Sequence, residues 1–160
     1  MSLKKIDFKK GKLYSIQINN IIEYNDIKNY INIDLVDKKR IKKYTLEKIM
    51  MEKSLLNEDE INNFRYDLDD TGVIELSTKL SELPESYLSL IYLKCISTKE
   101  ITQNIYFGNG GMHYDNLKLC YSIIKTILDK KGTCVMFNYP PSDNSILTKY
   151  IDKEKVEMII

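Results

Sequence analysis

The sequence contains no alanine and no tryptophan, and its only arginines are Arg40 and Arg65. Arginine makes the best bidentate contacts with phosphates and base edges, so its scarcity argues against a nucleic-acid-binding protein. Lysine, isoleucine, asparagine and tyrosine are abundant instead, a bias typical of an AT-rich coding sequence. The positive charge of this chain therefore comes almost entirely from lysine.

Cysteine is also scarce, and histidine occurs only once. The cysteines, Cys95, Cys120 and Cys134, are odd in number and far apart in the sequence, which argues against a disulfide framework or a zinc ribbon. One histidine and three scattered cysteines are too few to make a metal centre readily. We expect reduced, mostly buried thiols, no metal and no cofactor.

Long hydrophobic runs are missing as well. The longest nearly apolar stretch, residues 88–96, is interrupted by Ser89 and Lys94 and is far shorter than the roughly 20 residues of a membrane-spanning helix. No apolar stretch of the kind found in signal peptides follows the charged N-terminal segment. These absences predict a cytoplasmic protein with no membrane segment.

The length of 160 residues falls within the usual range of one domain. No internal repeat or Gly/Ser-rich linker divides the chain, so we expect a single domain over residues 1–160. Strands and helices are interspersed without strict alternation, which favours an α+β fold. The fold class predicted is a mainly antiparallel sheet packed by two or three helices.

Hydrophobic periodicity and β-branched residues locate the strands. The strands that we expect cover residues 13–18, 30–36, 73–76 and 133–139. Residues 87–96 could form a strand or, with Pro84 near a helix start, a helix. Their β-branched and aromatic residues favour a strand, joined through a hairpin at residues 97–100 to another strand over 101–107.

Capping signals and apolar spacing locate the helices. We expect helices that begin near Thr45 and Glu58, a helix over 115–130 and a last helix over 145–160. Asn57 and Glu60 have the spacing of a reciprocal capping box. The run Lys130-Lys131-Gly132 is a C-terminal stop for the third of these helices.

Asp67-Leu68-Asp69-Asp70-Thr71-Gly72 resembles the first motif of haloacid-dehalogenase-type phosphatases. The resemblance implies a magnesium-dependent enzyme with Asp67 as nucleophile and Asp69 as acid/base. That family places the motif after a buried strand, whereas residues 61–66 here have helical spacing. We therefore interpret the segment as a charged helix end that leads into a turn.

The loop from Gly108 to His113 is the most unusual segment, because it holds three of the six glycines and the only histidine. A loop ahead of a helix start can bind an anion through backbone N–H groups. It lacks the Lys and Ser/Thr of a P-loop, and its glycines do not have dinucleotide-binding spacing. Asn109, His113 and Tyr114 are the candidate ligand residues, and the alternative is a simple connector with no ligand.

Charge is distributed unevenly along the chain. Residues 1–53 carry a net charge of +6, residues 54–90 a net charge of −7, and residues 91–160 a net charge of +2. An acidic surface suits fast and specific docking of a basic partner, and tyrosine is favourable at interfaces. The acidic block is therefore the candidate partner-binding surface, with Glu58, Asp59, Glu60, Tyr66, Asp67, Asp69 and Asp70 as its members.

These patterns predict a protein-binding module without catalytic residues. Its general character matches bacterial toxin-immunity proteins, which would make the partner a basic toxin domain. Two alternatives stay open: a small enzyme that uses the Gly108–His113 loop, and a nucleic-acid-binding protein that uses the lysines. The balanced overall charge of +1 makes nucleic acid the weaker of the two.

Overall fold

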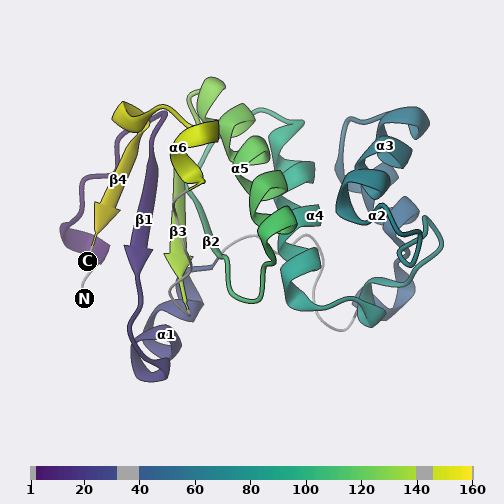
Figure 1. Cartoon of the computed structure of the whole chain (residues 1–160), viewed down its shortest axis with the longest axis horizontal. Helices are drawn as coiled ribbons and strands as arrows, with labels where there is room; N and C mark the ends of the chain where they lie inside the picture. The colour runs from purple at the N-terminus through teal and green to yellow at the C-terminus, as the bar shows by residue number, and fades with distance from the viewer. Residues whose placement is uncertain (1–2, 32–39, 140–145, 160) are drawn as a thin grey trace.

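In a computed structural model of the chain, residues 3–31, 40–139 and 146–159 are described. They form an α/β fold around one four-stranded sheet in which all strands are parallel (Figure 1). The sheet order is β2-β3-β1-β4, and the strands are β1 (Leu13–Gln17), β2 (Ile105–Gly108), β3 (Cys134–Asn138) and β4 (Val156–Ile159). The prediction of a mainly antiparallel α+β sheet is therefore wrong.

The strands are parallel because helices separate each strand from the next along the chain, and parallel strands need such long crossover connections. The α-helices of the described residues are α1 (Ile21–Ile27), α2 (Leu46–Lys53), α3 (Glu58–Leu68), α4 (Glu85–Ser97), α5 (Tyr114–Asp129) and α6 (Leu147–Tyr150). Short 3₁₀ turns are η1 (Leu3–Lys5), η2 (Lys28–Tyr30), η3 (Ile41–Lys43), η4 (Leu80–Glu82) and η5 (Lys153–Lys155).

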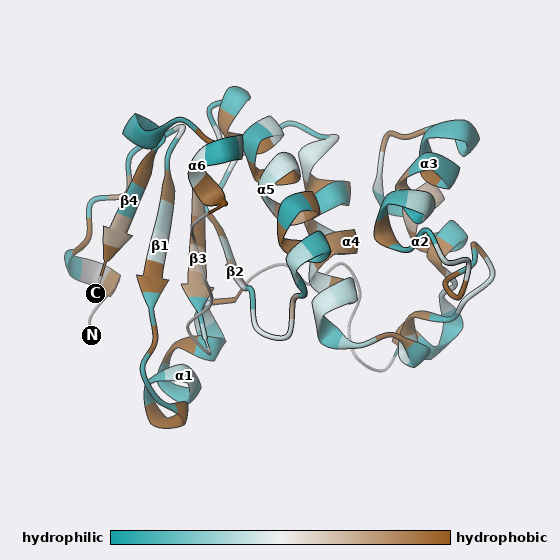
Figure 2. Ribbon diagram, in the orientation of Figure 1, coloured by the Kyte–Doolittle hydropathy of each residue, from teal (hydrophilic) through white to brown (hydrophobic). Residues whose placement is uncertain are grey.

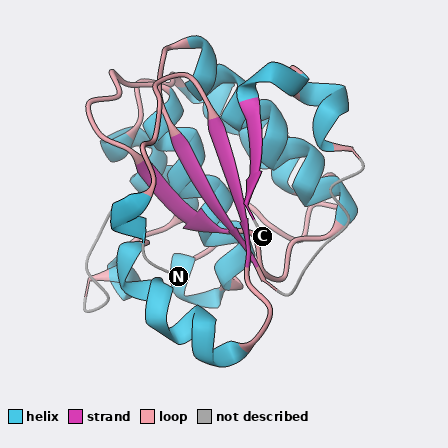
Figure 3. Ribbon diagram, turned by 90° about the vertical axis from the view of Figure 1, so that its left-hand side faces the viewer, coloured by secondary structure: helices cyan, strands magenta, loops and turns pink. Residues whose placement is uncertain are grey.

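The two faces of the sheet are covered unequally, by a thick layer and a thin layer, and Figure 3 looks toward the sheet with most of the helices behind it. On the thick side, α5 and α6 lie next to the sheet, α4 packs against α5, and α2 and α3 lie beyond α4 (Figure 1). This side contains the larger buried cluster, which includes Phe107, Tyr121 and Met136. The thin side contains a smaller cluster with Tyr14 and Phe137, covered by the N-terminal segment and α1.

Several elements form where the sequence predicted them. Strands β1 and β3 and helices α2, α3 and α5 agree with the expected segments to within one or two residues. The capping box of α3 is present: the Glu60 N–H donates to the Asn57 side chain at 2.9 Å, and the Asn57 N–H donates to Glu60 Oε1 at 3.0 Å. These signals were readable because their hydrogen bonds join residues three apart.

Residues 87–96 form a helix, α4, and not the strand of a hairpin. Helix α4 lies between α5 and α2 and is buried on most sides, so its apolar residues make no one-sided stripe. A short apolar run of this kind cannot be assigned by periodicity alone. The strand predicted over 101–107 exists only as β2, which pairs in parallel with β3.

Three further segments differ from prediction. Residues 73–76 form turns and no strand. The helix expected over 145–160 is limited to the short α6, and its second half is the edge strand β4. Of the strand expected over 30–36, Tyr30 belongs to a 3₁₀ turn and residues 32–36 lie outside the described residues.

No helix within the described ranges is both long enough and apolar enough to cross a membrane.

Candidate functional site

The carboxyl ends of β1, β2 and β3 meet at one edge of the sheet, and the chain leaves β1 and β3 toward opposite faces. After β1, helix α1 packs through Ile27 on the thin side. After β3, the next described helix, α6, packs through Leu147 on the thick side. Open parallel sheets bind ligands outside the carboxyl ends of their strands at such a switch point. This carboxyl edge is the candidate functional site.

The turn that follows β1 spans only Ile18 to Asn20 and has neither glycine nor lysine. Its backbone groups are used locally. The Asn19 N–H donates to Glu23 Oε2 at 3.0 Å, the Glu23 N–H donates to the Asn20 side chain at 2.9 Å, and the Ile18 N–H donates to the Asn138 carbonyl at 3.1 Å.

A loop that holds phosphate after a strand needs free N–H groups, glycines and a lysine. The β1 turn has neither the glycines nor the lysine, its Ile18 and Asn19 N–H groups are already bonded, and Glu23 adds a negative charge to the first turn of α1. A phosphate placed there would meet a carboxylate where it needs donors. The residues present after β1 therefore do not fit the phosphates of a nucleotide.

The end of β3 carries the amide side chain of Asn138 and no carboxylate. Asn138 is buried, and its Oδ1 accepts a hydrogen bond of 2.9 Å from Asn109 Nδ2. The Asn109 N–H also donates to the Phe137 carbonyl at 3.2 Å. Asn109, predicted as a ligand residue, is thus buried and ties the β2 loop to β3.

Two stacked tyrosines lie at the same edge. The rings of Tyr24 in α1 and Tyr139 after β3 have centroids 5.3 Å apart and an interplanar angle of 24°. Burial, and then the negative charge of Glu85, raise the pKa of Tyr24 above its ordinary value. The loop from β2 packs against the backbone of Tyr139 so closely that a Cβ on Gly110 would lie 2.6 Å from the Tyr139 carbonyl oxygen. Aromatic rings and packed backbone occupy the ends of β1 and β3.

The remaining part of the β2 loop is exposed and leads into the N-terminus of α5. His113 is the N-cap residue, but its side chain makes no capping hydrogen bond. Tyr114, 56% exposed, lies under the Lys118 ammonium at 4.6 Å. Gly111 adopts a positive φ of 76°, which glycine allows at no steric cost. His113 and Tyr114 are therefore accessible, as a ligand-contacting role requires.

The acidic residues predicted to bind a partner lie on α3 and the turn after it, on the far side of α4 from the sheet (Figure 1). Two of them have local structural roles. Glu60 belongs to the capping box, and Asp69 accepts hydrogen bonds from the N–H and hydroxyl of Thr71 and from the Ile74 N–H. Asp67, Asp70 and the other acidic side chains of α3 are exposed, and their partner-binding role stays a prediction. The structure does not bring this acidic surface to the β2 loop.

Neither an exposed cysteine nor a metal cluster is found in the described part of the chain. All three cysteines are buried, and burial raises the pKa of Cys120 to about 12. No group of three or more His, Cys, Asp or Glu side chains among the described residues could hold a metal ion. Asp67 lies near the end of helix α3 and not after a strand, as the interpretation of the phosphatase-like motif predicted.

Sequence reasoning missed Tyr24, Asn138 and Tyr139. The signal was present at the end of β3, where an apolar strand terminates in Asn-Tyr ahead of two prolines. This signal points to a site only when the parallel pairing of the strands is known, because that pairing places Asn138 and Tyr139 beside the turn after β1 and the loop after β2.

Comparison with solved structures shows the fold. The structure is similar to a protein from Pyrococcus furiosus described as an ABC transporter ATP-binding protein, with a TM-score of 0.58 and 15% identity over 96% of this chain and 87% of the other. It is also similar to an ATP-binding cassette of an ABC transporter in its ADP conformation, with a TM-score of 0.52 and 14% identity over 97% and 79%. No protein-family model and no curated protein matches the chain.

The α/β fold of the chain is therefore similar to the fold of these two solved proteins. The interpretation of the chain as a toxin-immunity protein is wrong, because these similarities indicate a nucleotide-binding type of fold that covers nearly the whole chain. Two alternatives stay predictions: a small enzyme that uses the Gly108–His113 loop, and a nucleic-acid-binding protein that uses the lysines.

Proposed function

We propose that the chain is a cassette-fold subunit that hydrolyses no nucleotide itself and docks, through the carboxyl edge of its sheet, on a protein partner that holds the nucleotide. The observation that carries this proposal is the turn Ile18–Asn20, which has no glycine and no lysine and whose Ile18 and Asn19 N–H groups are already hydrogen-bonded within the protein. The neighbours in fold are described as ATP-binding proteins, so ATP is the nucleotide to test.

The side chains at the carboxyl edge support the lack of hydrolysis, because they are poor ligands for phosphate and magnesium. Asn138 offers one amide oxygen, already engaged by Asn109, whereas magnesium prefers carboxylate oxygens. The Tyr24–Tyr139 stack fills the adjoining space with apolar surface. A triphosphate would have to displace these groups with no gain of charge-assisted hydrogen bonds.

Docking of a partner is supported by the exposed apolar residues of this edge. Ile21 and Ile22 on α1 are 54% and 71% exposed, and the outer turn of α1 is coloured hydrophobic in Figure 2. Tyr114 adds an exposed ring at the start of α5. Exposed apolar groups that gather on one face mark interaction sites. Three buried, uncrosslinked thiols are in keeping with a cytoplasmic location for the complex.

Within this complex, the exposed β2 loop would lie against the phosphates of the nucleotide that the partner holds. Helix α5 is 16 residues long, and the N-terminus of a helix carries roughly half a positive charge. His113 leaves the first N–H groups of α5 without a side-chain cap. The chain would then complete a nucleotide site without providing its phosphate loop.

The first test is phosphate release from Mg-ATP by the purified chain. We expect the background rate, because the turn after β1 has neither the glycines nor the lysine of a phosphate loop and β3 ends in the amide of Asn138. Turnover above background that is lost in H113A or in Tyr139→Ala would overturn the proposal.

The second test changes the helix start and keeps the fold. In H113D, the new carboxylate should cap α5 and stabilise the protein by about 1 kcal/mol, while it repels phosphate. After in-cell crosslinking identifies a partner with a GxxxxGK[ST] motif, H113D should weaken ATP-dependent association with that partner. Asn57→Asp is the matched control, since it makes the same charge change at the N-cap of α3. Equal association of both variants would contradict the assigned surface.

A further inference from the structure

A cleft of about 790 Å³ opens at the amino edge of the sheet, at the opposite ends of the strands from the candidate site. Its walls are residues 98–104 between α4 and β2, residues 130–133 between α5 and β3, and Lys10 ahead of β1. The volume falls within the range of small-molecule sites. The proposed function makes no use of this cleft.

The lining of the cleft is strongly basic. Lys10, Lys99, Lys130 and Lys131 contribute four positive charges, and Glu100 contributes the one negative charge. The C-termini of α4 and α5 also face this edge, and each adds roughly half a negative charge. A positive balance of roughly two charges remains after these helix ends are counted.

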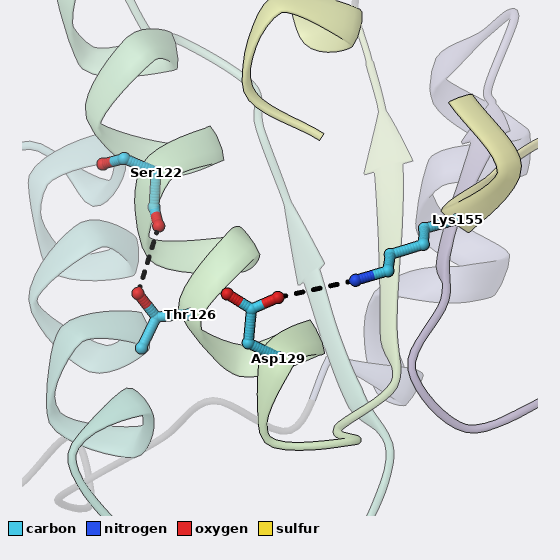
Figure 4. A network of polar contacts seen from close by, with 4 residues as sticks. All are labelled: Ser122, Thr126, Asp129 and Lys155. Atoms are coloured by element: carbon cyan, nitrogen blue, oxygen red, sulfur yellow. Dashed lines mark hydrogen bonds and ion pairs between the residues drawn. The ribbon is translucent and has the colours of Figure 1, made fainter. Parts of the chain in front are cut away.

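These lysines are not neutralised by neighbouring carboxylates. Asp129, directly before Lys130, is oriented toward Lys155 instead, with 3.5 Å between Oδ1 and Nζ (Figure 4). No ion pair found among the described residues involves a lysine of the cleft. Lys130 donates to the Ser97 carbonyl and so links α5 to α4, which leaves three lysines with no such bond there.

Capping of the helix ends does not explain the remaining lysines. At the end of α5, the Gly132 N–H donates to the Ile127 carbonyl at 3.0 Å and the Lys131 N–H donates to the Leu128 carbonyl at 2.9 Å. This is a Schellman motif, which satisfies the last carbonyls through the backbone. At the end of α4, the Thr98 hydroxyl donates to the Cys95 carbonyl at 2.7 Å.

Lys131 occupies the left-handed position of that motif, with φ of 65°. Glycine is the usual residue at this position because a Cβ is unfavourable there. Gly132 follows one position later, where a Cβ would lie 2.7 Å from Ile127 Cγ2 and 2.9 Å from the Ile127 carbonyl oxygen. A lysine is therefore held at the rim of the cleft in a conformation that disfavours it, and strain of this kind points to a functional role.

We infer that the amino-edge cleft binds a small ligand that carries several phosphate groups. Lysine is a common phosphate-binding side chain, and a clustered positive charge attracts a polyanion more than a single anion. Thr98, Thr102 and Gln103 line the cleft and supply neutral donors beside the lysines.

The test is calorimetric titration of the full chain with inorganic tripolyphosphate. We expect one saturable site, and affinity about tenfold lower in K99Q/K131Q, the effect of removing two partly exposed charge contacts. The control K43Q/K125Q loses the same charge at exposed positions outside the cleft and should bind as the wild type does. ATP and a single-stranded oligonucleotide are titrated in parallel, to distinguish free polyphosphate from a nucleotide and from nucleic acid.

Lys131→Gly separates binding from folding. Glycine relieves the left-handed strain, so K131G should unfold at a higher temperature than the wild type and still bind tripolyphosphate more weakly. The inference is overturned if no saturable binding occurs, if both double variants lose affinity equally, if K131G binds as the wild type does, or if only the oligonucleotide binds. None of these outcomes depends on whether a partner docks at the carboxyl edge.

Discussion

Gly110 and Gly108 lie two residues apart but meet very different surroundings. A Cβ on Gly110 would lie 2.6 Å from the Tyr139 carbonyl oxygen, whereas a Cβ on Gly108 would have its nearest neighbour at 3.8 Å. Backbone cannot yield as a flexible side chain can, so the added methyl group at position 110 must displace the β2 loop from the end of β3.

We expect Gly110→Ala to lower the free energy of unfolding by about 1–3 kcal/mol, the usual cost of overpacking. Gly108→Ala should leave it nearly unchanged. Urea denaturation of the two variants beside the wild type provides the measurement. Equal stability of the two would show that the loop does not pack against Tyr139 as described.

At the scale of the element, Asp69 terminates α3 and organises the turn that follows. Its carboxylate accepts hydrogen bonds from the Thr71 hydroxyl at 2.6 Å and from the Ile74 N–H at 2.9 Å. These hydrogen bonds hold the pKa of Asp69 below the ordinary value of 3.8, and the bond from the Thr71 side chain has the largest effect. Asp69, the second aspartate of the segment that resembled a catalytic motif in the sequence, thus has a structural role at the end of a helix.

The lowered pKa predicts a pH dependence with a definite sign. The folded state favours the ionised form, so the contribution of Asp69 to stability is complete above pH 3.8 and is lost as the pH falls through its lower folded pKa. Asp69→Asn should therefore be less stable than the wild type at pH 7, and the difference should shrink in strong acid. Urea midpoints of both proteins across the acidic range measure this, and a difference that stays constant would contradict it.

The sequence could predict those elements whose stabilising contacts join residues close together in the chain. The capping box of α3 and the amphipathic stripe of α5 act over three or four residues, so the pattern contains them. Helix α4 was mistaken for a strand because neighbours on most sides bury it and remove the stripe. Strand β4 was mistaken for a helix because its pairing with β1, distant in the sequence, decides its conformation.

At the scale of the whole molecule, the two faces of the sheet are covered unequally. The thick side holds most of the buried apolar residues, and the thin side holds the small cluster around Tyr14 and Phe137. Strand β3 is buried throughout, whereas β4 lies at the edge and Met158 is 51% exposed. Segments with few buried contacts open more often than the core does.

Hydrogen exchange measured by mass spectrometry should show this asymmetry. We expect the amides of β3 and α5 to exchange slowest, and those of α1 and β4 to exchange faster by on the order of tenfold or more. Uniform protection across the four elements would mean that the thin layer opens only with the entire fold. Docking of a partner at the carboxyl edge should slow exchange in α1 and leave β4 unaffected.

The sequence by itself determined the starts of α2 and α3, the extent and amphipathic face of α5, the buried thiols and the unusual loop from Gly108 to His113. Each depends on contacts between near neighbours or on composition. Only the tertiary structure decided that the strands are parallel, that the Tyr24–Tyr139 stack fills the switch point, and that four lysines line one cleft. These features join residues as distant as Leu13 and Cys134, and no local pattern specifies which distant segment a strand will pair with.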